Sequence, residues 1–220
     1  MDSSNPYPEN DTSQDASRAF DIVALASSAG GLKALMQILC DLPANFPAAI
    51  VVVQHLDPRH PSLMAHILSR RTFLEVKEAE SEECLKPGTV YIAPPNRHLL
   101  VNTNGTLTLT QTELVHFLRP SADLMLDSVA ASYKERAIAV ILTGTGRDGA
   151  MGIEAIHKMG GKVIVQDQET AEFFGMPRAA INTGMVDWIL PLPEIASALI
   201  KLVMVQTSKV NREQGIGNRE

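Results

Sequence analysis

Serine, histidine and aspartate, the three side chains of a hydrolase triad, each follow a short apolar run in this sequence. They are Ser28, His55 and Asp148. A serine hydroxyl can attack an acyl carbon, a histidine can take up its proton near neutral pH, and an aspartate can orient the imidazole. These residue types predict acyl-transfer chemistry, provided that the fold brings them together.

The surroundings of Ser28 approximate a nucleophile elbow, a tight turn from a strand into a helix that exposes a serine hydroxyl. The segment 26–31 has the sequence ASSAGG, with Ala26 in the place of the first glycine of the usual pattern. The backbone N–H of Ala29, directly after the serine, is the oxyanion donor expected from such a turn. A serine-glycine turn that only caps a helix is the alternative interpretation.

A glycine-rich loop offers a second, competing hypothesis. Residues 144–149 have the sequence GTGRDG, the G-x-G-x-x-G pattern of a dinucleotide-binding turn, and Asp167 ends the next predicted strand. Asp148 argues against a bound nucleotide, because its negative charge would face the pyrophosphate if the side chain pointed into the loop. Orienting and stabilising an imidazolium is the alternative role for Asp148.

The elements that must position these residues follow from the pattern of apolar runs. Short β-branched runs alternate with stretches of helical period, which predicts parallel strands joined by helices. The strand-like runs lie at 21–26, 48–54, 137–143, 162–166 and 186–190. The dipeptide Asn104-Gly105, between two alternating runs, predicts an antiparallel hairpin.

We therefore expect an α/β fold of the doubly wound class. Its mainly parallel sheet is flanked by helices in three layers, with an antiparallel hairpin near one edge. The carboxyl ends of parallel strands share one edge of a sheet, where ligands bind, so Ser28, His55 and Asp148 can meet there.

Composition limits the classes of protein to consider. The 220 residues are 45% hydrophobic with a net charge of -6, which predicts one globular domain and argues against nucleic-acid partners. Residues 1–19 are predicted to be a disordered lead, 20–206 the folded domain and 207–220 a flexible tail. Cys40 and Cys84 lack metal-ligand spacing, and no apolar run is long enough for membrane insertion. We expect a cytoplasmic protein without a metal.

Six blocks of this sequence resemble, in order, the catalytic domain of the chemotaxis protein-glutamate methylesterases of the CheB type. The blocks are ASSAGG, VVVQHLDP, YIAPPNRHL, LRPSADLML, ILTGTGRDGA and FFGMPRAAI, and the resemblance covers about residues 20–203. It implies that the folded domain is a methylesterase catalytic domain in which Ser28 is the nucleophile, His55 the general base and Asp148 the triad acid.

The resemblance also implies a reaction and partners. The reaction is hydrolysis of glutamate γ-methyl esters on the cytoplasmic helices of chemoreceptors, with glutamine deamidation as a second activity and no cofactor. His98 and Arg119 match family positions near the cleft and are expected to bind substrate. Thr145 stands where the family usually has methionine, so the oxyanion pocket is expected to include Thr145.

Family members commonly carry an N-terminal phospho-receiver domain, whereas only about 20 residues precede the first predicted strand here. We expect a catalytic domain that lacks this switch in cis. Three alternatives stay open for its control: gating by a separate receiver protein, constitutive activity, or an origin from a longer chain. Two other functions stay open. One is a divergent serine esterase or amidase for another substrate, and the other is a catalytically silent binding module of a signalling array.

Overall fold

The computed structural model of the chain describes residues 20–55 and 62–204. The lead predicted for residues 1–19 and the tail predicted for 207–220 lie outside the described residues. In the described part of the chain, no helix has both the length and the apolar character needed to cross a membrane.

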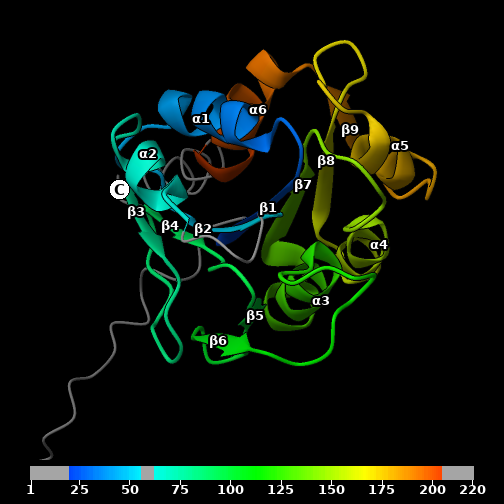
Figure 1. The fold of residues 1–220 in the computed structure, drawn as a ribbon. Helices are drawn as coiled ribbons and strands as arrows, with labels where there is room; N and C mark the ends of the chain where they lie inside the picture. The colour runs from blue at the N-terminus through cyan, green and yellow to red at the C-terminus, as the bar shows by residue number, and fades with distance from the viewer. Residues whose placement is uncertain (1–19, 56–61, 205–220) are drawn as a thin grey trace, which may run out of the picture.

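Seven parallel strands form the central sheet (Figure 1). They are β1 (Ile22–Ser27), β2 (Ala49–Gln54), β3 (Glu75–Glu78), β4 (Thr89–Ile92), β7 (Ala137–Ile141), β8 (Lys162–Gln166) and β9 (Trp188–Leu190). Their order across the sheet is β3-β4-β2-β1-β7-β8-β9. Every residue of β1, β2 and β7 is buried, as expected for strands covered on both faces.

Helices cover both faces of the sheet and complete the three predicted layers. One face carries α1 (Gly31–Asp41), α2 (Met64–Ser69) and α6 (Leu192–Met204). The other carries α3 (Ala122–Tyr133), α4 (Ala150–Lys158) and α5 (Gly175–Ile181). A short 3-10 helix, Lys134–Arg136, follows α3. Alternate residues of β1 enter the two cores, Val23 and Leu25 on the α1 face and Ile22, Ala24 and Ala26 on the α3 face.

The predicted hairpin forms from β5 (His98–Val101) and β6 (Leu107–Thr110), but as a separate antiparallel sheet. It packs against α3, where the Ser128 hydroxyl accepts a hydrogen bond from the N–H of Val101 and the Ser132 hydroxyl donates to its carbonyl. The preceding run 89–92 is a parallel strand of the main sheet, β4, beside β2. The hairpin therefore leaves the hydrogen bonding of the main sheet uninterrupted.

The order in which the chain adds strands to the sheet reverses at β1. From this strand the chain runs through α1 to β2 on one side, whereas β7 lies on the other side and leads through α4 to β8. Helices α1 and α4 cover opposite faces (Figure 1). Such a switch point opens a crevice at the carboxyl ends of the strands. The residues that follow β1, β2 and β7 therefore gather at one place.

Candidate active site

The register of β1 and β2 places Ser28 beside His55. Ser27 pairs with Gln54 at the ends of the two strands, and the N–H of His55 donates to the Ser27 carbonyl at 3.1 Å. On the other side of β1, the N–H of Ser28 donates to the Thr143 carbonyl at 3.0 Å. The Ser28 backbone is thus fixed between β2 and the segment that follows β7.

Gln54 fastens the turn that carries Ser28 to the turn that carries His55. Its side-chain amide donates to the carbonyl of Ser28 at 2.7 Å and to that of His55 at 3.0 Å. Its side-chain oxygen accepts from the Ser27 hydroxyl at 2.6 Å. Gln54 was not foreseen from the sequence, although a polar residue at the end of an otherwise apolar strand is a signal that could have identified it.

The turn itself depends on two glycines. Gly30 has a φ of 78°, a left-handed conformation that glycine adopts without steric cost. A Cβ on Gly31 would lie 2.0 Å from the side-chain oxygen of Gln54 and 2.6 Å from the Ser27 hydroxyl. Small residues here let α1 start directly against the strand ends.

His55 and Asp148 are in direct contact. The Nε2 atom of His55 lies 2.7 Å from Oδ2 of Asp148, whose side chain is buried. Burial alone would raise the pKa of Asp148, but hydrogen bonds from His55 and from two backbone N–H groups outweigh it and leave that pKa below its ordinary value. An ionised carboxylate only accepts hydrogen bonds, so Nε2 of His55 is the donor, and in the neutral imidazole Nδ1 then holds the free electron pair.

Asp148 also caps the start of α3. Its Oδ2 atom accepts from the N–H of Ala122 at 2.6 Å, and its Oδ1 atom accepts from the N–H of Asp123 at 3.0 Å. The hydroxyl of Ser121 donates to Oδ1 as well, at 3.0 Å. With His55, four donors converge on this carboxylate. Its position is therefore fixed by a helix that starts 26 residues earlier in the sequence.

Asp123 in turn caps the start of α4. Its Oδ1 atom accepts from the N–H groups of Gly149 at 2.9 Å and Gly152 at 2.8 Å. Burial, followed by the nearby charge of Asp148, raises the pKa of Asp123 to about 6. Two aspartates thus clasp the starts of two helices reciprocally. Asp123 was not foreseen from the sequence, because the helix α3, in whose first turn it lies, was itself not predicted, although Ser121 followed by an acid is a signal for a helix start.

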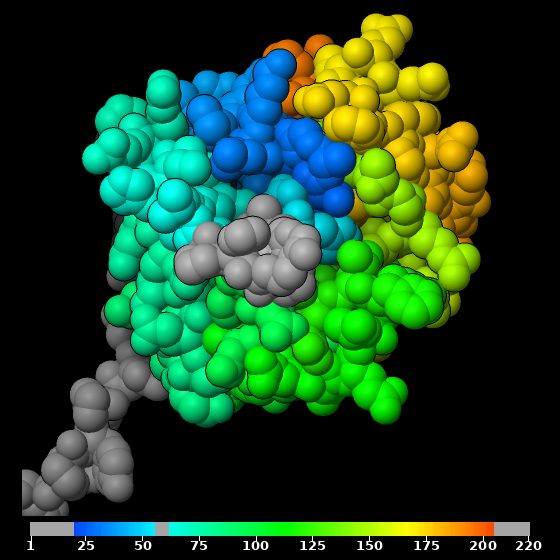
Figure 2. All heavy atoms as spheres, in the orientation of Figure 1, coloured from blue at the N-terminus to red at the C-terminus, as the bar shows by residue number. Residues whose placement is uncertain are grey.

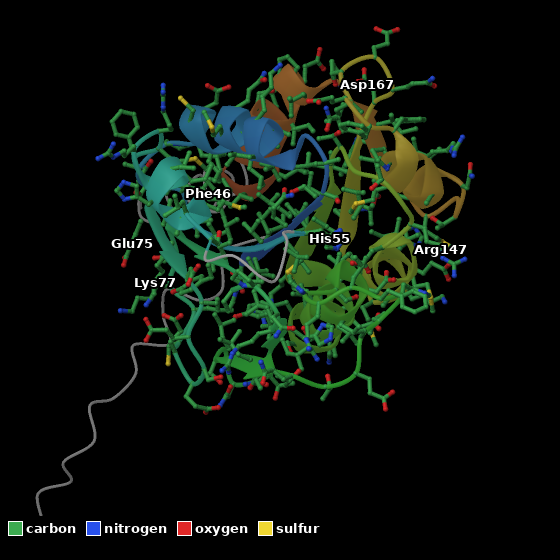
Figure 3. The ribbon with its side chains drawn as sticks, viewed as in Figure 1. Phe46, His55, Glu75, Lys77, Arg147 and Asp167 are labelled. Atoms are coloured by element: carbon green, nitrogen blue, oxygen red, sulfur yellow. The ribbon has the colours of Figure 1, made fainter. Side chains whose placement is uncertain are left out.

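This clasp bears on the dinucleotide hypothesis for the loop 144–149. A pyrophosphate would need the free N–H groups at the start of the helix after the loop. In α4 the N–H groups of Gly149 and Gly152 already donate to the carboxylate of Asp123. Asp167 caps a turn by accepting from Thr170, and Figure 3 shows it well apart from His55. The loop therefore serves to hold Asp148.

The structure places His98 and Arg119 differently from each other. His98 is fully buried, its Nδ1 atom accepts from the N–H of Ser121, and its Nε2 atom donates to the carbonyl of Glu113. A ring so enclosed cannot make the substrate contact that was expected for His98. It instead holds Ser121, whose hydroxyl donates to Asp148. Arg119 lines a cavity of about 270 Å³ that His55 also lines.

The two expected oxyanion residues, Ala29 and Thr145, lie in the turns after β1 and β7. Ala29 is partly buried and Thr145 is exposed. Neither backbone N–H donates to another described residue. In the described part of the chain, neither N–H group is therefore committed to a protein acceptor.

The face that carries these residues is assembled from distant parts of the sequence. In Figure 2, blue, cyan, green and yellow-green atoms meet near its centre. Figure 3 places His55 centrally on this face and Arg147 beside α4. Among the described residues, no group of three or more His, Cys, Asp and Glu side chains could hold a metal ion.

Comparison with known proteins shows several close similarities. FrzG of Myxococcus xanthus, a protein-glutamate methylesterase, is 44% identical over 186 residues, which are 84% of this chain and 56% of FrzG. A putative protein-glutamate methylesterase/protein-glutamine glutaminase of Leptospira interrogans is 41% identical over 183 residues, 83% of this chain and 95% of that protein. The chain thus spans little more than half the length of FrzG and nearly all of the Leptospira protein.

A solved structure extends the similarity to three dimensions. The catalytic domain of the Thermotoga maritima CheB methylesterase superposes with a TM-score of 0.81 at 44% identity, over 84% of this chain and 99% of that domain. The sequence model of the CheB methylesterase family matches residues 23–199. With this match over most of its length, the chain belongs to the CheB methylesterase family.

Proposed function

We propose that this protein is a protein-glutamate methylesterase, a serine hydrolase that cleaves glutamate γ-methyl esters on the cytoplasmic helices of methylated chemoreceptors. The observation that carries the proposal is the 2.7 Å contact between His55 and Asp148 at the switch point where Ser28 also emerges. The names of FrzG and of the Leptospira protein support the same reaction class.

In the first half of the reaction, Oγ of Ser28 attacks the ester carbon while Nδ1 of His55 takes the hydroxyl proton. Asp148, held ionised by its four donors, stabilises the imidazolium that forms. The C–O bond to the methoxy group then breaks, and His55 returns the proton to the leaving oxygen. Methanol departs, and the glutamyl group stays on Ser28 as an ester.

In the second half, water attacks this acyl-enzyme with His55 again as the base, and the glutamate and the free Ser28 hydroxyl are released. The same sequence on a glutamine releases ammonia. Each tetrahedral intermediate carries a negative oxygen, for which the N–H groups of Ala29 and Thr145 are the proposed donors. Both are without a described partner, which supports this role.

The test is the release of labelled methanol from a methylated chemoreceptor. The chain as it stands should release methanol, and Ser28→Ala should reduce the rate to background with an unchanged far-UV circular dichroism spectrum. Ser197→Ala, which removes an exposed hydroxyl on α6, is the matched control and should keep full activity. Methanol release by Ser28→Ala at the rate of the unaltered chain would refute the proposal.

The partner and compartment form a finer part of the proposal. We place the reaction in the cytoplasm, where the receptor helices lie, and two exposed free thiols, Cys40 and Cys84, fit a reducing compartment. Regulation by a separate phospho-receiver protein predicts that adding a phosphorylated receiver changes the rate of methanol release. A divergent esterase would instead hydrolyse small p-nitrophenyl esters and leave the receptor methylated.

A further inference from the structure

The connection between β6 and α3 exposes unusually large apolar side chains. We refer to residues 111–120 as the 111–120 loop, which is the green segment that joins β6 to α3 in Figure 1. The Phe117 side chain is 94% exposed and that of Leu114 is 51% exposed. A phenyl ring so fully in water gains nothing for folding, since the hydrophobic effect rewards only the burial of apolar area. The ring therefore has no structural role within the described protein.

The 111–120 loop is nevertheless held in one shape. The N–H groups of Val115 and Leu118 donate to each other's carbonyl groups at 3.1 and 2.8 Å, which closes a tight turn around Phe117. The guanidinium of Arg119 donates to the carbonyl of Thr112 at 2.6 Å and to the side chain of Asn96 at 2.7 and 2.9 Å. Phe117 is thus presented by a bonded turn.

The backbone of this turn is strained. Phe117 has a φ of 65° and its neighbour His116 a φ of 49°, both in the left-handed region that bulky residues rarely adopt. Strained residues of this kind persist where the surrounding structure holds them, and they cluster at binding sites and active sites. The strain has no compensating contact for the ring, so it points to a role in binding.

The same loop forms a wall of the cavity that His55 lines. That cavity has a volume of about 270 Å³ and is bounded on one side by His55 and Asn96. Its other side is formed by five residues of the 111–120 loop, namely Leu114, Phe117, Leu118, Arg119 and Pro120. A protein segment that fills this cavity beside His55 therefore lies against the 111–120 loop. The exposed apolar surface is continuous with the site of the chemistry.

Charge restricts the kind of segment that fits. Arg119 donates to one amide oxygen and two backbone carbonyls and forms no ion pair with a carboxylate of the described residues. In the described part of the chain, no carboxylate therefore pairs with this positive charge in the cavity. An acidic side chain on the bound segment would supply the missing counter-charge.

We infer that the 111–120 loop is the docking surface for a helix of the substrate protein. The apolar stripe of that helix covers Phe117 and Leu114, and an acidic residue beside the stripe pairs with Arg119. An amphipathic helix offers an apolar stripe bordered by charged residues at helical spacing, which matches this surface. The inference rests on the proposed function, because the receptor helices are the substrate it assigns.

The experiment compares a protein substrate with a small one. In Phe117→Asn the ring is lost, but asparagine tolerates the left-handed conformation better than other residues with a side chain, so the turn is kept. Phe73→Asn is the matched control, since Phe73 is 82% exposed and lies between α2 and β3. For each variant, kcat and KM are measured with methylated receptor and with p-nitrophenyl acetate.

Phe117→Asn should lower kcat/KM for the receptor by about 10- to 100-fold, chiefly through KM, as expected for an aromatic anchor of an interface. It should lower kcat/KM for p-nitrophenyl acetate much less than for the receptor, and Phe73→Asn should change neither. An unchanged receptor KM in Phe117→Asn, with an active unaltered chain, would overturn the docking surface and leave the proposed function intact. An equal loss on both substrates would also overturn it.

Failure of the proposed function looks different. In that case the unaltered chain hydrolyses p-nitrophenyl acetate and releases no methanol from the receptor. The docking surface for receptor helices then falls together with the function on which it rests. The Phe117→Asn comparison on an active chain tests the docking surface alone.

Discussion

The carboxylates of Asp148 and Asp123 lie in the same buried clasp yet differ in their proton affinity. Four donors reach Asp148, and the hydrogen bonds from His55, Ala122 and Asp123 lower its pKa against the effect of its burial. Asp123 receives two backbone N–H groups, and its burial together with the charge of Asp148 raises its pKa to about 6. The site thereby keeps one carboxylate charged for His55 and supports its loop with a second one that is less acidic.

This difference predicts how stability depends on pH in Asp123→Asn. The folded pKa of Asp123 is raised above 3.8, so its contribution to stability is fully present below about pH 4 and is lost as pH rises through about 6. The amide oxygen of asparagine can still accept from Gly149 and Gly152, but it does not titrate. Relative to the unaltered chain, Asp123→Asn should therefore gain stability between pH 4.5 and pH 7.

Urea unfolding followed by far-UV circular dichroism at both pH values measures this gain. Asp41→Asn, which removes an exposed carboxyl at the end of α1, serves as the control. A constant difference in unfolding free energy between Asp123→Asn and the unaltered chain would contradict the assignment of the raised pKa to Asp123.

The sequence predicted the residues at strand ends better than the residues that support them. Ser28, His55 and Asp148 follow apolar runs that were predicted to be parallel strands of one sheet, and the structure joins His55 to Asp148 by a hydrogen bond. Their catalytic roles stay predictions. Gln54 and Asp123 were not foreseen, because a capping or bridging side chain is recognised by which N–H or carbonyl it meets, and that depends on tertiary packing.

At the scale of elements, the turn between β1 and α1 depends on the absence of a side chain at Gly31. A Cβ there would lie 2.0 Å from the Gln54 side-chain oxygen, well inside van der Waals contact. Gly31→Ala should force Gln54 away from the carbonyls of Ser28 and His55 and cost about 1–3 kcal/mol of unfolding free energy. Because Gln54 holds the two turns together, kcat should fall as well.

Urea unfolding and methanol release measure the two effects of Gly31→Ala. Lys33→Ala, at an exposed position of the same helix, is the control and should change the unfolding free energy by less than about 0.5 kcal/mol. Full activity and stability in Gly31→Ala would show that the bridge by Gln54 adapts and is not required.

Strands with a clear apolar run were predicted from the sequence. An element whose conformation depends on pairing with another part of the chain was not. The runs that became β1, β2, β7, β8 and β9 are apolar enough to be recognised, and Asn104-Gly105 marked the hairpin. Strand β3 has the sequence EVKE and is largely exposed. Its strand conformation comes from pairing with β4 at the sheet edge, which no local pattern reveals.

At the scale of the whole molecule, the site draws on both layers of helices. Ser28 leads into α1 on one face of the sheet, whereas Asp148 is held between α3 and α4 on the other. The strands between the two cores are shared, since alternate residues of β1 enter each core. We therefore expect the described domain to unfold as one unit, and activity to be lost with it.

Substitutions on the two faces test this coupling. Leu35 of α1 and Leu126 of α3 are both fully buried, on opposite sides of the sheet. Leu35→Ala and Leu126→Ala should each lower the unfolding free energy by about 2–5 kcal/mol. Met151→Ala, on an exposed position of α4, should change it by less than about 0.5 kcal/mol.

In every variant, urea midpoints from far-UV circular dichroism, from the fluorescence of Trp188 on the edge strand β9 and from esterase activity should coincide. Trp188 is the single tryptophan of the chain, so its signal reports on the β9 edge of the sheet, whereas circular dichroism reports on all helices. If Leu126→Ala lowered the activity midpoint below the circular dichroism midpoint, the α3 layer would open before the α1 layer. The clasp of Asp148 and Asp123 would then be a locally unfolding unit rather than part of one cooperative domain.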